Sequence, residues 1–76
     1  MTSAYVFIQV GGIDNGQTFL DSLRAIPGVK SAHFVWGPID CILFAEAPDM
    51  PGLISLTAKI RSTPGVASLD SRLVQA

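Results

Sequence analysis

The sequence contains a single cysteine, Cys41, and a single histidine, His33. One cysteine cannot form a disulfide within the chain, and one cysteine with one histidine cannot supply the four ligands of a structural zinc site. A chain of 76 residues forms one domain and buries only about 60–65% of the surface that its unfolded form exposes. With disulfides and metals excluded, association with other chains is the expected means of stabilisation.

Charged residues are also scarce. They make up 14% of the chain, against roughly 25% in an ordinary globular domain, while apolar residues make up 49%. Too few charges remain to coat a small monomer, whose surface is large for its volume. We therefore expect another copy of the chain to cover part of the apolar surface.

The sequence lacks both a basic cluster and a long apolar run. The net charge is −1 and the five cations are scattered, at Arg24, Lys30, Lys59, Arg61 and Arg72. A domain that binds nucleic acid through its phosphates needs a basic face, so no direct nucleic-acid partner is expected. Residues 1–4 do not resemble the start of a signal peptide, and no apolar stretch approaches the roughly 18 residues of a membrane span. These absences predict a cytoplasmic protein.

The run Ala4–Val10 is rich in β-branched and aromatic residues and is a predicted strand. Further strands are predicted at Ser31–Trp36, at the short apolar run Cys41–Ala47, and at Ser68–Gln75, which completes the order. Two segments carry apolar residues at helical spacing, with Asn15 and Asp49 as predicted N-caps. Each of these segments ends at a Pro-Gly pair. The predicted order is therefore β-α-β-β-α-β.

The two halves of the chain resemble each other. A shift of 37 positions superposes Pro27-Gly28-Val29 on Pro64-Gly65-Val66 and Arg24 on Arg61, and it also places Phe7 on Phe44. Two βαβ units in tandem predict the α+β class and a ferredoxin-like two-layer sandwich. In that fold a four-stranded antiparallel sheet carries both helices on one face.

Alternation along the first and third strands sorts their side chains into two faces. Small and aliphatic residues suit packing against the helices: Val6, Ile8, Val10, Leu43, Ala45 and Ala47. The other face then holds Tyr5, Phe7, Ile42 and Phe44, with Gln9 and Glu46 at its end. Nothing in the chain is left to cover this face, so we predict that it is a dimer interface.

No catalytic constellation is recognisable. His33 is predicted in mid-strand with no nucleophile placed beside it by a motif, and the neighbouring Asp40 should raise the pKa of the Cys41 thiol. The glycine-rich run from Gly11 to Gly16 matches neither of the common phosphate-binding loops, so it is interpreted as a turn. No cofactor or metal is expected, and the chain is not expected to be an enzyme.

The segment from Trp36 to Asp40 joins the two halves and is the unrepeated part of the chain. It contains a flat aromatic side chain, a rigid Gly37-Pro38 pair, Ile39 and a carboxylate. An aromatic wall, free backbone amides and a carboxylate would suit a small zwitterion such as an amino acid. The residues equally fit a hairpin turn in which Asp40 accepts hydrogen bonds from backbone N–H groups. The sequence leaves both interpretations open.

Three segments, in this order and spacing, resemble the effector-binding domain of the Lrp/AsnC transcription regulators, also called the RAM (regulation of amino-acid metabolism) domain. They are Leu23–Val29, Trp36–Asp40 and Lys59–Val66. The likeness covers nearly the whole chain, and no helix-turn-helix segment precedes it in the sequence, which implies a stand-alone version of that domain.

The resemblance implies a dimer formed through the open sheet face and dimers assembled into a ring of eight or more chains. It implies that an amino acid or related molecule binds between dimers, with Asp40 holding the ligand ammonium and Leu69 and Ser71 on the last strand completing the site. Ile39 and Leu69 stand where the family often has a tyrosine and a hydroxyl residue, which leaves two interpretations: a ligand with an apolar side chain, or an empty structural pocket. Such a sensor would influence transcription indirectly, by co-assembling with a DNA-binding relative.

Two other functions remain open from the sequence. The first is a small dimeric ferredoxin-like enzyme, of the cofactor-free monooxygenase or isomerase type, with His33 or Tyr5 as the working residue. The second is a purely structural assembly module with the same oligomer and no response to a ligand.

Overall fold

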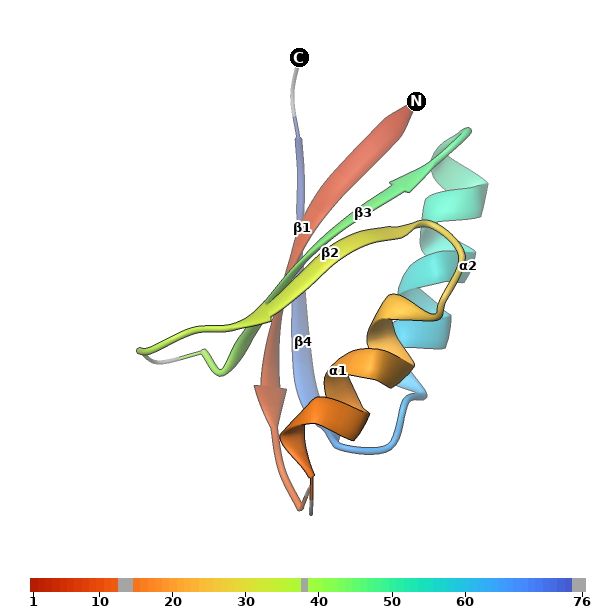
Figure 1. Cartoon of the computed structure of the whole chain (residues 1–76). Coiled ribbons are helices and arrows are strands. Elements are labelled where there is room, and N and C mark those ends of the chain that lie inside the picture. Colours follow the sequence, from red (N-terminus) through yellow and green to blue (C-terminus); the bar gives the residue numbers. More distant parts are fainter. Residues whose placement is uncertain (13–14, 38, 75–76) are drawn as a thin grey trace.

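The sheet and the helices of the computed structural model follow the predicted order. The structure describes residues 1–12, 15–37 and 39–74. The elements along the chain are β1 (Thr2–Val10), α1 (Gly16–Arg24), β2 (Val29–Phe34), β3 (Cys41–Ala47), α2 (Met50–Arg61) and β4 (Val66–Leu73). The antiparallel sheet has the strand order β2-β3-β1-β4, and both helices lie on one side of it (Figure 1). The predicted ferredoxin-like fold is confirmed.

The helix caps are those predicted from the sequence. The Asn15 side chain accepts a hydrogen bond from the Thr18 amide at 3.1 Å, and the Asp49 carboxylate accepts one from the Gly52 amide at 2.8 Å. Each bond satisfies an amide that the first helical turn would otherwise leave without an acceptor. The caps thus set where α1 and α2 begin.

The core lies between the helices and one face of the sheet. The strands contribute small and aliphatic side chains, and the helices contribute larger ones. Its most buried large side chains are Val6, Ile8, Leu23, Cys41, Leu43 and Ile60. The residues predicted for this face lie on it, with Val10 packed against the core at its edge.

The opposite face of the sheet carries the four predicted residues. Tyr5 lies opposite Phe44 and Phe7 lies opposite Ile42, and the rings of Tyr5 and Phe44 are 4.9 Å apart. The Arg72 guanidinium lies 6.0 Å from the centre of the Phe7 ring and forms a 2.9 Å ion pair with Asp70. No helix of the described chain covers this face (Figure 1).

The Pro-Gly turns that end both helices have the same geometry. Gly28 and Gly65 have positive φ angles of 100° and 103°. After each turn the next strand contains a β-bulge, which leaves Lys30 without a cross-strand partner in β2 and Ala67 without one in β4. The bulges let these strands begin directly after the turn, so β2 and β4 start and end earlier than predicted. The predicted end at Gln75 lies outside the described residues.

The pairing of the halves needs one correction. In the ladders Ser31 lies opposite Phe44 and Ser68 lies opposite Gln9, so the structural equivalent of Phe44 is Gln9 and not Phe7. The first strands are therefore displaced by two residues from the ungapped alignment. Because side chains alternate with a period of two, this displacement leaves every residue on its predicted face.

Candidate functional site

The hairpin between β2 and β3 projects beyond the rest of the sheet (Figure 1). Its base is closed by a 3.0 Å hydrogen bond from the Val35 amide to the Asp40 carbonyl. The Asp40 amide donates in turn to the carbonyl of Ile8 in β1, at 3.1 Å. At the tip, Gly37 has a φ of 132°, which residues other than glycine rarely adopt. Pro38 lies outside the described residues.

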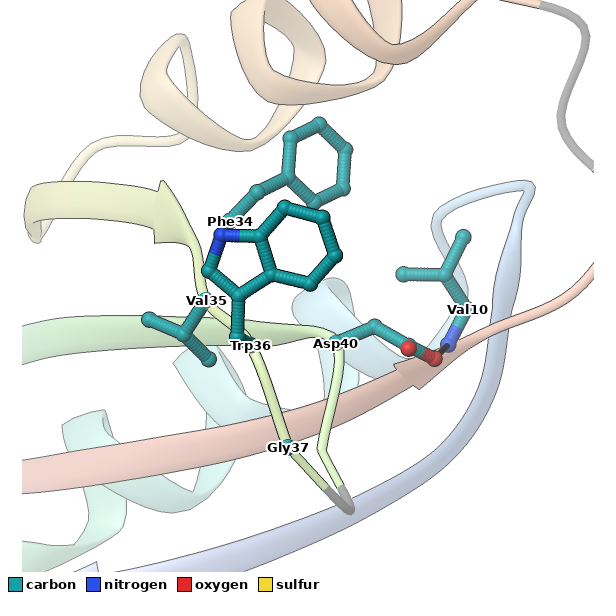
Figure 2. A pocket seen from close by; sticks show the side chains of 6 residues that line it. All are labelled: Val10, Phe34, Val35, Trp36, Gly37 and Asp40. Carbon is teal, nitrogen blue, oxygen red and sulfur yellow. Dashed lines mark hydrogen bonds between the residues drawn. The ribbon is translucent and has the colours of Figure 1, made fainter.

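The Asp40 carboxylate ties this hairpin to the end of β1. Its Oδ2 accepts a 2.9 Å hydrogen bond from the Val10 amide, as Figure 2 shows. This bond is the one expected of a structural turn residue. Each carboxylate oxygen can accept more than one hydrogen bond and Asp40 is exposed, so the charge stays available to a cationic group. The structural interpretation and the binding interpretation are thus compatible.

An open pocket of about 530 Å³ lies beside this carboxylate. Its walls are mostly apolar, and the described residues that line it all come from the hairpin or the adjacent end of β1: Val10, Phe34, Val35, Trp36, Gly37 and Asp40 (Figure 2). The Trp36 side chain is fully exposed, at 102% of its reference area. The pocket therefore combines one carboxylate with an aromatic and aliphatic wall that this chain leaves open to solvent.

Only part of the predicted binding set meets at this pocket. Trp36, Gly37 and Asp40 line it, while Ile39 is half-buried and does not. Leu69 packs against the core, and Ser71 lines a different groove, beside α2. Val10 and Phe34 were not predicted as lining residues. The antiparallel pairing of β1 with β3 could have indicated Val10, because it places the end of β1 beside the start of β3.

The candidate catalytic residues lie elsewhere. His33 is exposed on the open sheet face, opposite Ile42, and Tyr5 lies on the same face. Neither lines the hairpin pocket or the groove beside α2. Among the described residues no group of three or more His, Cys, Asp and Glu side chains could hold a metal ion.

Cys41 is buried and its pKa is raised. Burial is the main cause, while a hydrogen bond with the backbone of His33 and the charge of Arg24 oppose the rise. The neighbouring Asp40 carboxylate, which was expected from the sequence to raise this pKa, does raise it but has the smallest effect of the four. A buried thiol with a raised pKa is a poor nucleophile.

None of the described helices is both long and apolar enough to cross a membrane. No functionally curated protein sequence matches the chain.

Solved structures of about the same size are similar along nearly their whole length. Hypothetical protein PHS023 from Pyrococcus horikoshii is 25% identical with a TM-score of 0.86, and the match covers 100% of this chain and 92% of that one. TTHA0845 from Thermus thermophilus is also 25% identical, with a TM-score of 0.87 and coverage of 100% and 95%.

A longer protein shares the fold over part of its length. The transcriptional regulator NMB0573 from Neisseria meningitidis, solved as a complex with L-Met, is 23% identical with a TM-score of 0.87. The match covers 99% of this chain and 50% of the regulator, so the chain spans about half of that protein. A protein family is matched over residues 3–76. The chain belongs to the Lrp/AsnC ligand binding domain family, a family of regulatory ligand-binding domains of transcription regulators.

Proposed function

We propose that this chain is an oligomeric, non-enzymatic sensor that binds an amino acid or a closely related zwitterion at the hairpin pocket. The observation that carries the proposal is the placement of the Asp40 carboxylate at the mouth of an otherwise apolar pocket. A carboxylate fixes an ammonium group by a charge-assisted hydrogen bond, and the apolar wall suits an aliphatic or thioether side chain. The L-Met complex of the Neisseria regulator is consistent with this ligand class.

The pocket is open on the side that faces away from the domain. Trp36 is fully exposed and Phe34 is 42% exposed, so a ligand bound to one chain alone would keep much of its surface in water. Small-molecule sites usually bury most of their ligand. A second chain that closes the pocket would supply the missing wall, which supports a site between subunits.

The open sheet face supports a dimer. Tyr5, Phe7, Ile42 and Phe44 form an apolar patch at its centre, and Tyr5 is 46% exposed. Polar groups flank this patch along β4, where Asp70 and Arg72 form their ion pair. An apolar centre with a polar edge is the usual arrangement of a protein–protein interface. We propose that two chains pack through this face and that dimers assemble further into a ring.

The role in regulation follows from the family. The five Lys and Arg residues are scattered along the sequence and form no basic cluster in it, so the proposed contact with DNA is made through another protein. A DNA-binding Lrp/AsnC relative that shares the sheet-face interface is the proposed partner. Ligand binding between subunits would then alter the stability of the mixed assembly.

The test is a thermal-shift screen of the purified protein against the twenty amino acids, with Asp40→Asn and Asp40→Ala as variants. We expect a subset with apolar side chains to raise the melting temperature of the wild type. Asp40→Asn keeps an oxygen that can accept the Val10 hydrogen bond but removes the charge, so we expect a fold of near wild-type stability without the ligand response. Asp40→Ala removes both the charge and the hydrogen-bond acceptor, so it should abolish the ligand response and also lower the stability of the ligand-free protein.

A structural assembly module is the second candidate, and the hydrogen bond between Val10 and Asp40 is the observation that favours it. It predicts the same oligomer, a loss of stability in Asp40→Ala, and no response of the wild type to any amino acid. That set of results would reject the sensor. A response that Asp40→Asn retains in full would reject the proposed role of the carboxylate.

A further inference from the structure

The two halves of the chain differ in the groove between the helix and the outer strand. The turn before each of β2 and β4 and the bulge near the start of each strand coincide when the halves are superposed, so Phe34 of β2 and Ser71 of β4 are structural equivalents. Phe34 lies opposite the buried Cys41, and Ser71 lies opposite the buried Val6. Both side chains therefore lie on the helix side of the sheet.

In the first half this groove is filled. The Phe34 ring stacks on Phe19 with the ring centres 6.2 Å apart, and a Cβ at Gly16 would lie only 3.0 Å from its edge. The Arg24 guanidinium donates two hydrogen bonds to the Ala32 carbonyl, at 3.2 and 2.6 Å. The ring thus packs between the start of α1 and β2, and the arginine joins the end of α1 to β2.

In the second half the corresponding groove is open. Ser71 is too small to fill it, and a space of about 340 Å³ remains between α2 and the end of β4. Its walls are mainly apolar and include Leu53, Ile54, Thr57 and Leu73, of which Ile54 is 62% exposed and Leu73 is 56% exposed. Arg61, the equivalent of Arg24, also lines the groove and makes no side-chain hydrogen bond or ion pair with the described residues.

The first half therefore shows what such a groove accommodates, which is an aromatic ring packed on the start of the helix. In the second half the groove is also lined by an arginine, Arg61. The chain has one tryptophan, Trp36, and it is fully exposed beside Gly37 in the projecting hairpin (Figure 2). An indole is the ring most strongly attracted by an arginine cation. The charges are also complementary, because the hairpin carries Asp40 and the groove is lined by Arg61.

We infer that the α2–β4 groove of one chain receives the Trp36 side chain of a second copy. This inference rests on the proposed oligomer and names the contact that joins its dimers. The groove lies on the helix side of the sheet and the proposed dimer interface lies on the other side, so both contacts can form at once. The projecting Trp36 side chain and the groove that receives it lie on different parts of one chain, so the contact between two copies is head-to-tail. Head-to-tail contacts build a closed ring when the rotation from one subunit to the next divides a full turn.

Three variants test the contact. Trp36→Ala removes the projecting indole. Ser71→Phe fills the groove with a phenyl ring, as Phe34 does at the equivalent position of the first half. Ser55→Phe is the matched control, because it adds the same ring to an exposed position of α2 outside the groove. In sedimentation velocity the wild type and Ser55→Phe should form assemblies larger than a dimer, whereas Trp36→Ala and Ser71→Phe should stop at the dimer. Circular dichroism confirms that each variant is folded.

Fluorescence of the single tryptophan reports the same contact directly. Emission of the wild type should shift to shorter wavelength as the protein concentration rises and the indole enters a groove, while Ser71→Phe should keep the emission of an exposed indole. A mixture of Trp36→Ala and Ser71→Phe tests whether the two variants can pair with each other. Addition of Trp36→Ala, which has a groove but no tryptophan, should shift the emission of Ser71→Phe.

Two results would overturn the inference. The first is large assemblies of Trp36→Ala or Ser71→Phe at wild-type concentrations. The second is an emission that stays constant while the wild type assembles. Either result leaves the sheet-face dimer and the Asp40 ligand response to be judged separately, because Phe7→Glu tests the dimer and Asp40→Asn tests the response. If Ser71→Phe does not fold, Trp36→Ala and the wild-type emission still decide the question.

Discussion

Replacement of Phe34 by serine would make the first half of the chain resemble the second. The Phe34 side chain is 42% exposed, so slightly more than half of it is buried against α1. Full burial of a phenylalanine contributes about 1.5–3 kcal/mol, so this fraction contributes about 1–1.5 kcal/mol. The stacked contact with Phe19 adds about 0.5–1 kcal/mol. We expect Phe34→Ser to lower the free energy of unfolding by about 2 kcal/mol.

A second substitution shows whether the ring is the cause. In the wild type, Gly16→Ala places a methyl group 3.0 Å from the Phe34 ring, so crowding offsets the gain in helix propensity. In the Phe34→Ser background the ring is absent, and the same change should stabilise α1 by up to about 1 kcal/mol. The two substitutions should therefore be coupled by more than about 0.5 kcal/mol in a double-mutant cycle.

The assay is urea unfolding followed by circular dichroism at one fixed protein concentration, because the stability of an oligomer depends on concentration. Val35→Ser, at the next position of the hairpin, serves as the control: Val35 is 37% exposed, so its substitution should cost about 1 kcal/mol through lost burial, without the additional loss of a stacked ring contact. The reasoning is refuted if Phe34→Ser costs no more than this control, or if Gly16→Ala has the same effect in both backgrounds.

Three further predictions concern the turn, the thiol and the second helix cap. Gly28→Ala should lower the free energy of unfolding by about 3 kcal/mol in thermal unfolding, because its φ is 100° and the new Cβ would lie 2.7 Å from Leu56 and 2.9 Å from the Glu46 carbonyl oxygen. Gly12→Ala is the control: its φ is 67° but the space around it is open, so it should cost only about 1 kcal/mol. Folding raises the pKa of Cys41 above its ordinary value of 9.0, so the folded chain keeps a proton that the unfolded chain loses, and stability should fall as the pH rises through that value. In Cys41→Ala the stability should fall less steeply as the pH rises. Equal slopes of stability against pH in the variant and the wild type would contradict this prediction. Asp49→Ala should cost about 1 kcal/mol in urea unfolding, while Asp49→Asn, which can still cap α2, should cost little.

Most of the fold could be predicted because local signals agree with one another. Asn15 and Asp49 have short polar side chains that suit helix starts, and each Pro-Gly pair stops a helix that cannot continue through it. Alternation along β1 and β3 determined the two faces of the sheet. The displacement of Gln9 relative to Phe44 could not be predicted, because a shift of two residues changes neither the alternation nor the face.

The site was predictable only in part, because its walls come from different strands. Trp36 and Asp40 belong to one short hairpin segment and could be grouped from the sequence. Val10 lines the pocket because β1 pairs with β3. Phe34 lines it because it is the last residue of β2, directly before the hairpin turn. The groove beside α2 results from a small residue, Ser71, where the other half has a ring, and only superposed strands show that these positions correspond.

Native mass spectrometry tests the central claim most directly, because it counts chains and bound molecules in one spectrum. The protein is purified from its own cells and measured before and after exchange into excess of the amino acid that gives the largest thermal shift. A sensor with its site between subunits predicts assemblies larger than a dimer that retain the ligand mass, Asp40→Asn assemblies that do not, and ligand-free monomers on dissociation. Assemblies of the wild type that hold no small molecule under either condition would contradict it.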